Sequence, residues 1–248
     1  MNLNIQKTAV LTRFKFKELT RNKTFLISAL LVPLFTVAIR FVYANMFTEH
    51  EMPSMLMGMV LNIGLLMNLT MIGLMMPATM LAKDKEKNTL RTLMTSSVNG
   101  LEYFISAVLP NFLVSWLICI AVLLISGVQL SSNEIILFLV VSGMCSLISC
   151  VLGMLVGLFA KNQMASGNIS SLLMLVIMMV PMFSSMVPSL AKVAQFIYTG
   201  IIGQLATSFV EGNQQGLSVQ SWLVLVVELV ASIVLFVVSY RKNGFERE

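Results

Sequence analysis

The stretch LAKDKEKNTLRTLMTSSVNG, Leu81–Gly100, lies between two long apolar runs of a 248-residue chain. Only 11% of the chain is charged, yet six charged residues fall within nine positions of this stretch (Lys83, Asp84, Lys85, Glu86, Lys87 and Arg91). A soluble domain has about 25% charged residues. With 57% hydrophobic residues, this chain has too few charges to cover a surface that faces water. We therefore expect an all-α integral membrane protein in which the stretch joins two membrane spans.

Six apolar runs are long enough to cross a bilayer, whose hydrocarbon core needs about 20 residues of helix. Backbone groups find no water in lipid, which favours a helix for each run. The predicted spans are Thr24–Met46, Met55–Leu81, Tyr103–Val128, Glu134–Ala160, Asn168–Met186 and Ser221–Tyr240. We expect one domain, residues 1–248, with an N-terminal segment 1–23, a bundle 24–240 and a tail 241–248. The first run follows a charged segment and is long enough to span, so we interpret it as a retained anchor.

Positive charge is distributed unevenly about these spans. On one side of the predicted topology lie 14 of the 16 lysine and arginine residues (Lys7, Arg13, Lys15, Lys17, Arg21, Lys23, Lys83, Lys85, Lys87, Arg91, Lys161, Arg241, Lys242 and Arg247). The positive-inside rule places that side, with both termini, in the cytoplasm. The other side carries only Lys192, and Arg40 falls within the first span. Orientation therefore explains the net charge of +5 without a nucleic-acid partner, and we expect a multi-pass protein of a prokaryotic plasma membrane.

Two segments outside the spans are also partly apolar. In IQKTAVLTRFKFKELTRNK, residues 5–23, apolar residues approximate one helical face and basic residues occupy the rest. This pattern predicts an amphipathic helix in the headgroup plane, and the alternative is a helical flank of the first span. Between the last two spans, LAKVAQFIYTGIIGQLATSFV, residues 190–210, carries one cation. It favours an external re-entrant pair of short helices, and the alternative is a helix on the outer leaflet.

The residues after the charged run of the opening stretch form an amphipathic pattern. Asn88 or Thr89 can cap the start of a helix there. Four apolar residues then fall on one helical face (Leu90, Leu93, Met94 and Val98). A short helix that projects from the bundle must bury this face, either on the membrane surface or in the groove of a soluble partner.

KDKEKNTLRTLMTSSV, residues 83–98, resembles a segment of ABC-2-type transporter permeases in which charged residues precede Gly-Thr-Leu, then a Leu and Ser-Pro-Val. Asn88 replaces the Gly, and Ser97 replaces the Pro. In that family the segment includes a coupling helix, which docks in a cleft of the ATP-binding subunit. The resemblance assigns this role to a cytoplasmic helix between spans two and three, with the residues Lys83, Glu86, Thr89, Leu90, Leu93 and Val98.

The resemblance extends over essentially the whole chain, through the basic N-terminal helix, the six spans and the external segment. VPMFSSMVPSLAKVAQFIY, residues 180–198, is similar to the family's stretch that leads into its re-entrant helices, and Pro181 and Pro188 carry that match. The resemblance implies a permease subunit of an exporter of lipophilic or amphipathic cargo, such as a drug, peptide or lipid. It also implies a separate ATP-binding-cassette subunit and a second permease chain, identical or different, within the lipid bilayer.

Other kinds of chemistry have little support in the sequence. No G-x-x-x-x-G-K-[ST] pattern occurs, so we expect no enzyme and no bound cofactor, with ATP and Mg²⁺ held by the partner subunit. His50, the only histidine, lies between Glu49 and Glu51, which is more typical of a solvated loop than of a metal site. Two further functions stay open: an ion-coupled carrier, and a membrane immunity or scaffold protein that does not transport.

Four residues within the spans are further candidates. Arg40 and Glu228 are expected at similar depth in the outer half of the first and sixth spans, where charges are costly. They pair with each other, or one lines the transport path, or each is satisfied separately. Gly153 and Gly157 end a stripe of small residues in the fourth span. The stripe predicts close helix packing inside the bundle, and the alternative is a dimer contact.

The predicted orientation can be tested by cysteine labelling in whole cells. A membrane-impermeant maleimide should modify a Lys192→Cys variant from outside, and an Arg91→Cys variant only after the membrane is permeabilised. Each variant is compared with the parent chain, whose three cysteines lie within apolar runs. Labelling of Arg91→Cys in intact cells would reverse the topology and remove the partner-docking role from the opening stretch.

Overall fold

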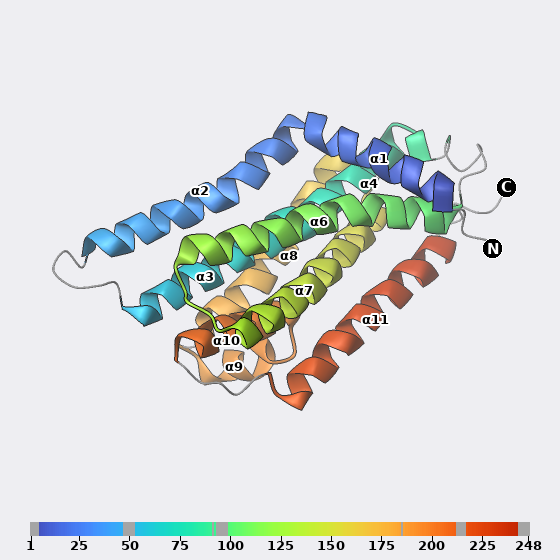
Figure 1. The fold of residues 1–248 in the computed structure, drawn as a ribbon. Coiled ribbons are helices and arrows are strands. Elements are labelled where there is room, and N and C mark those ends of the chain that lie inside the picture. The colour runs from blue at the N-terminus through green and yellow to red at the C-terminus, as the bar shows by residue number, and fades with distance from the viewer. Residues whose placement is uncertain are drawn as a thin grey trace.

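A computed structural model describes residues 5–46, 53–90, 92, 99–184, 186–211 and 217–242. All regular structure in those ranges is helical, which confirms the all-α prediction (Figure 1). Six segments are long and apolar enough to cross a membrane. They are α2 (Lys23–Met46), the composite α3–η1–α4 (Ser54–Glu86), α6 (Gly100–Ser126), α7 (Ser132–Phe159), α8 (Gln163–Phe183) and α11 (Val219–Lys242). The predicted six-span bundle is therefore confirmed.

Short polar signals set the ends of several spans. Asn99 begins α6 and Ser131 begins α7, each through a capping box with the glutamate three residues later. Asn162 begins α8, where its Oδ1 accepts a hydrogen bond from the backbone N–H of Ala165. Gly127 ends α6 in the left-handed conformation, with φ of 79°. These caps explain why α6, α7 and α8 begin two to five residues before the apolar runs suggest.

The second span is one long helix with a wide turn in its middle. It consists of α3 (Ser54–Asn68), the π-helical η1 (Leu69–Met75) and α4 (Met76–Glu86). The carbonyl of Leu69 accepts a hydrogen bond from Ser149 Oγ of α7 at 2.5 Å. The predicted end at Leu81 is wrong, because the helix continues to Glu86. It continues because its charged last turn finds partners on neighbouring helices.

α7 packs directly against this second span. A Cβ atom placed on Gly153 would lie 2.2 Å from the carbonyl oxygen of Leu74, and one on Gly157 would lie 2.5 Å from that of Ala78. The two helices are thus in contact backbone to backbone, and only glycine fits at both positions. α7 also packs against α6, α10 and α11, so it occupies the centre of the bundle.

Two short helices follow α8. They are α9 (Pro188–Ala194) and α10 (Tyr198–Val210), and they meet at an angle of 108°. α10 packs against α3 and α7, and most of its side chains are buried. Gly200 permits the sharp bend, because a Cβ there would lie 1.9 Å from the carbonyl oxygen of Ala194. This bent pair occupies the segment for which we predicted a re-entrant pair; its depth in the membrane stays a prediction.

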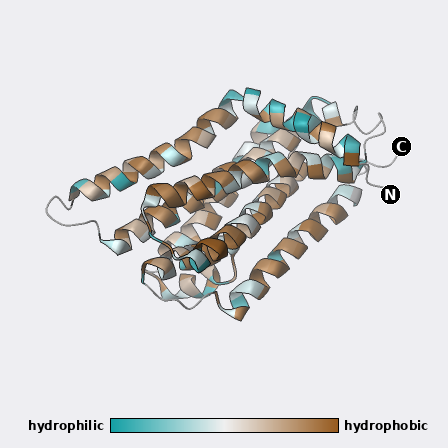
Figure 2. Cartoon of the chain, viewed as in Figure 1, coloured by the Kyte–Doolittle hydropathy of each residue, from teal (hydrophilic) through white to brown (hydrophobic). Residues whose placement is uncertain are grey.

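α1 (Ile5–Arg21) packs along α6 rather than standing apart from the bundle. It buries Lys15 and Leu19, whereas Ile5 and Phe16, expected on the same apolar face as Leu19, are exposed. The face is shifted because Lys15 finds a buried partner on α4. Hydrophilic residues gather on α1 and at its junction with α2, while the spans are mostly hydrophobic (Figure 2). The start of α1, the end of α4 and the end of α11 lie at the same end of the bundle (Figure 1).

The contact between α7 and α4 should not tolerate a larger residue. We expect Gly153→Ala to lower the stability of the detergent-solubilised protein by about 1–3 kcal/mol, because the added methyl group meets backbone that cannot move aside. Gly167→Ala in α8 is the matched control, since a Cβ there meets nothing within 4 Å. Thermal unfolding of both variants measures the difference, and equal midpoints would contradict the close packing.

Candidate functional site

A buried ion pair joins α1, α4 and α6 at the end of the bundle where α1 starts. Lys15 Nζ donates to Asp84 Oδ2 at 2.5 Å and to Glu18 Oε2 at 3.0 Å. The hydroxyl of Tyr103 donates to the same Asp84 oxygen at 2.5 Å, and Lys15 Nζ lies 5.5 Å from the centre of the Tyr103 ring. Lys15 and Asp84 are almost fully buried. A charge pair in this position is stable only while both partners and the hydroxyl are present.

The four residues Lys83–Glu86 contact four different helices. Successive residues of an α-helix point about 100° apart, so one charged turn can reach in every direction. Lys83 Nζ forms an ion pair with Glu18 of α1 at 3.1 Å, and Asp84 contacts α1 and α6. Lys85 and Glu86 turn toward the junction between α7 and α8. The charged run of the opening stretch is therefore a set of contacts between helices, and its residues are not simply exposed to solvent.

Lys85 and Glu86 each match the charge of a helix end. Lys85 Nζ donates to the carbonyls of Leu158 and of Ala160, the latter at 2.8 Å, where α7 ends. Glu86 Oε2 accepts a hydrogen bond of 2.9 Å from the backbone N–H of Gln163, where α8 begins. A cation at a C-terminus and an anion at an N-terminus both interact favourably with the helix dipole. The pair therefore fixes the turn between α7 and α8 to the end of α4.

The protonation of Glu18 is set by its two lysine neighbours. Burial opposes ionisation, but Lys15 and Lys83 outweigh that effect and hold the pKa of Glu18 below its usual value. A carboxylate whose folded-state pKa is lowered stabilises the fold at neutral pH, and its contribution is lost as the pH falls through that lowered value. The contacts of Glu18 are thus fully formed at physiological pH.

Asn88 makes the turn that follows α4. Its φ of 55° lies in the left-handed region, which glycine adopts freely and asparagine tolerates better than most residues. Its carbonyl accepts the backbone N–H of Thr92 at 3.1 Å, which begins another helical turn. The glycine expected here from the family resemblance is thus replaced by a residue suited to the same backbone conformation. Thr89 is partly exposed beside it.

Leu90 does not present its side chain to a partner. It is 1% exposed and lies in a hydrophobic cluster with residues of α4, α6, α7 and α11, among them Leu81, Tyr103 and Tyr240. The face that we predicted to need a partner or a membrane surface is therefore covered by the chain itself at this position. Two other predicted contact residues, Leu93 and Val98, lie outside the described residues, as do His50 and its acidic neighbours.

The structure does not bring Arg40 and Glu228 together. Arg40 Nη1 donates to the carbonyl of Ile125 near the end of α6, and its guanidinium lies against Gly127. Glu228 lies on α11, at the opposite edge of the bundle from α2 (Figure 1). Its Oε2 is buried with no hydrogen-bond partner among the described residues. Arg40 is thus satisfied by a backbone carbonyl of α6, whereas one carboxylate oxygen of Glu228 has no partner among the described residues.

The two predicted prolines mark the ends of helices near the bent pair. Pro181 lies in the last turn of α8, and its carbonyl accepts the N–H and the hydroxyl of Ser184. Pro188 is in the first turn of α9, where a missing N–H costs nothing. Among the described parts of the chain, no group of three or more histidine, cysteine or acidic residues could hold a metal ion.

The sequence alone did not identify Lys15, Glu18 or Tyr103 as members of the site. The available signal was the presence of charges in an apolar chain and the spacing of Lys15 and Glu18 by one helical turn. Asp84 stood in the charged run, but its partners are 69 and 19 positions away. Pairing over such separations cannot be read from local patterns.

The family comparison gives a match over most of the chain. The model of a family described as ABC-2 family transporter protein matches residues 42–240. The match covers four of the six spans completely and α11 up to Tyr240, and it begins within α2, so α1 precedes it. No curated protein matches the chain.

Removing one partner of the buried pair should destabilise the protein strongly. We expect Asp84→Asn or Lys15→Met to lower the free energy of unfolding by about 3–5 kcal/mol. The first variant leaves the buried ammonium of Lys15 without its main counter-ion, and the second leaves the buried carboxylate of Asp84 without its cation. The double variant should cost clearly less than the sum of the two. Chemical unfolding in detergent measures this cycle, with the exposed Arg13→Gln as a control of no more than about 0.5 kcal/mol. Additive costs in the double variant would show that the two residues are not coupled.

Proposed function

Because the chain belongs to the ABC-2 family of transporter proteins, it is a membrane permease of an ABC transporter, and we propose that it exports cargo with ATP hydrolysed by a separate subunit. The permease itself is a transport component without a catalytic site. ATP and Mg²⁺ would be bound by the ATP-binding-cassette partner, and the absence of a P-loop pattern in this sequence supports that division. A second permease chain would complete the transporter.

The proposed partner docks on the connection between α4 and α6. The observation that carries this proposal is the charged last turn of α4, where four successive residues contact α1, α6, α7 and α8. A displacement of the connection would therefore reach four helices at once, without a long chain of intermediate contacts. The buried cluster around Leu90 strengthens the link, because it ties the connection to α6, α7 and α11.

The location of the basic residues supports a cytoplasmic position for this end of the bundle. The start of α1, the end of α4 and the end of α11 lie together (Figure 1), and the whole of α1 with these two helix ends carries nine of the 16 lysine and arginine residues. The positive-inside rule then predicts that both termini and the docking connection face the cytoplasm, where ATP is available. The membrane would be the plasma membrane of a prokaryote.

The proposed cargo is lipophilic or amphipathic. α2, α8 and α11 expose mostly apolar side chains, and Arg40 and Glu228 are the ionisable residues in the middle of the described spans. A hydrophilic ion or sugar would need a more polar path than these helices provide. Motion of the connection between α4 and α6 would rearrange the spans and open a route for such cargo. The cargo would leave the membrane interior on the side opposite the cytoplasm.

Docking can be tested by purifying the tagged chain from its native membranes and identifying co-purifying proteins. We expect an ATP-binding-cassette subunit with the wild type, and at least a tenfold lower yield of it with Leu93→Asp, because a carboxylate in an apolar contact weakens it by more than about 1.4 kcal/mol. Val219→Asp places the same change on an exposed residue at the other end of the bundle, and it should keep the partner.

Leu90→Asp is unsuitable for this purpose, because Leu90 belongs to the interior of the chain. Retention of the partner by the Leu93 variant would move the docking site elsewhere. If cross-linked native membranes yield no ATP-binding-cassette subunit with the wild type, the proposal of ATP-driven transport fails.

A further inference from the structure

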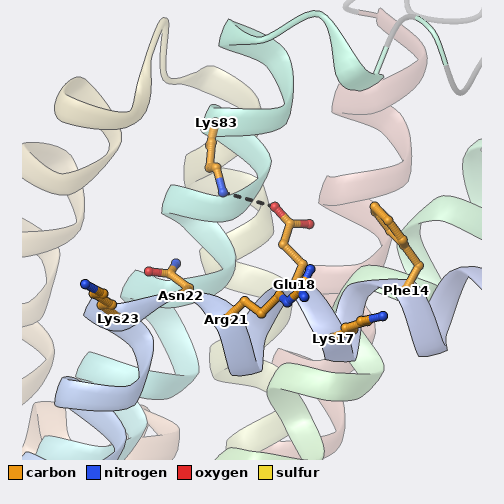
Figure 3. Close-up of a pocket in the computed structure, with 7 residues that line it drawn as sticks. All are labelled: Phe14, Lys17, Glu18, Arg21, Asn22, Lys23 and Lys83. Carbon is orange, nitrogen blue, oxygen red and sulfur yellow. Dashed lines mark hydrogen bonds and ion pairs between the residues drawn. The ribbon is translucent and has the colours of Figure 1, made fainter.

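An open pocket lies at the junction of α1 and α2, and it shares only Glu18 and Lys83 with the contacts described above. Its volume is about 570 Å³, within the usual range for small-ligand sites. Its lining includes Phe14, Lys17, Glu18 and Arg21 of α1, Lys23 at the start of α2 and Lys83 of α4 (Figure 3). The four residues from α1 are spaced as i, i+3, i+4 and i+7, so they occupy one face of that helix.

The pocket holds an excess of positive charge. Figure 3 shows Glu18, its only carboxylate, reaching Lys83, with which it forms an ion pair of 3.1 Å. Lys17, Arg21 and Lys23 are exposed, and no ion pair with any of them occurs among the described residues. Lys17 and Arg21 stand four positions apart on a helix, where like charges repel. An anion in the pocket would relieve this repulsion.

The pocket lies beside the ends of two predicted membrane spans. α2 starts at Lys23, and its first turns expose the apolar side chains of Leu26, Ile27 and Leu30. Lys83 is three residues from the end of the second span. One span thus begins and another ends beside the pocket, so we expect its opening at the depth of lipid headgroups. Phe14 adds an exposed aromatic ring to the rim, suited to the glycerol and upper acyl region of a lipid.

From this geometry we infer that the pocket binds the headgroup of an anionic phospholipid. The phosphate is held by Arg21, whose guanidinium can donate two parallel hydrogen bonds. Lys17 and Lys23 lie on either side of Arg21 and point away from each other (Figure 3), so they add electrostatic attraction from the two edges of the pocket. The acyl chains lie along the exposed apolar face of α2. Basic pockets beside spans recognise anionic headgroups in this way, whereas a zwitterionic lipid would place its own cation among three others. The inference requires only a membrane and does not depend on an ATPase partner.

Lipid selectivity tests the inference on the full-length chain. Native mass spectrometry of the detergent-solubilised protein, titrated with phosphatidylglycerol or phosphatidylcholine, gives an apparent affinity for each lipid. We expect phosphatidylglycerol to bind more tightly than phosphatidylcholine. Replacing all three cations (Lys17→Gln, Arg21→Gln and Lys23→Gln) should weaken phosphatidylglycerol binding by a factor on the order of 100, at roughly fivefold or more for each cation.

Two further variants isolate the pocket from general electrostatics. A control that removes the same number of charges elsewhere (Arg13→Gln, Lys161→Gln and Lys192→Gln) uses exposed residues outside the pocket, one of them on α1 itself, and should bind as the wild type does. A variant that keeps the charge (Lys17→Arg, Arg21→Lys and Lys23→Arg) should retain most of the affinity. If the triple glutamine variant does not fold, Lys17→Gln and Arg21→Gln are measured singly, each with an expected loss of about fivefold.

The source of the anion is distinguished by adding inorganic phosphate. If phosphate at millimolar concentration displaces phosphatidylglycerol completely, the pocket is a site for free anions, and the lipid assignment is overturned. Equal binding of the two lipids, or an equal loss in the matched control, would also overturn it. A selective loss in the pocket variant, unaffected by phosphate, supports it.

Discussion

One carboxylate oxygen, Asp84 Oδ2, holds three helices together at the charged end of the bundle. It accepts hydrogen bonds from Lys15 of α1 and from Tyr103 of α6, while Asp84 itself belongs to α4. The group is nearly fully buried, so its ionised form is tolerable only with both donors in place. Because α4 stays helical through this residue, its neighbours on the same turn point to α1, α7 and α8. The arrangement of the whole charged turn thus depends on the burial of Asp84.

A second constraint operates between two of the spans, α7 and the second span. α7 meets the second span backbone to backbone at Gly153 and Gly157, which leaves no flexible side chain between them. The π-helical η1 is part of this contact, because Leu74 belongs to it. Ser149 bonds both the carbonyl of Leu69 in η1 and the hydroxyl of Tyr198 on α10. Packed contacts of this kind do not deform continuously. A movement at the end of α4 would therefore reach α7 and α10 as a displacement of whole helices.

Hydropathy and charge patterns were sufficient to predict the spans, because lipid imposes length and helicity on any apolar run that crosses it. They failed at positions where a distant partner decides the outcome. Lys15 was expected on the polar face of α1, yet Asp84 draws it into the interior. Leu90 was expected to face outward, yet the ends of α6, α7 and α11 cover it. Arg40 and Glu228 have similar expected depths, but depth alone does not specify which side of the bundle each helix occupies.

Glu18 of α1 contacts the charged turn of α4 and also lines the basic pocket, so it links the two. Its two oxygens contact Lys15 on one side and Lys83 on the other. An anion in the pocket would compete with Glu18 for Lys83, which leaves Glu18 to pair more closely with Lys15 and hence with the Asp84 contacts. The reverse holds by thermodynamic reciprocity: any movement of α4 that separates Lys83 from Glu18 frees a fourth cation for the anion. With an anionic lipid in the pocket, the composition of the membrane and the position of α4 would therefore be coupled through the carboxylate of Glu18.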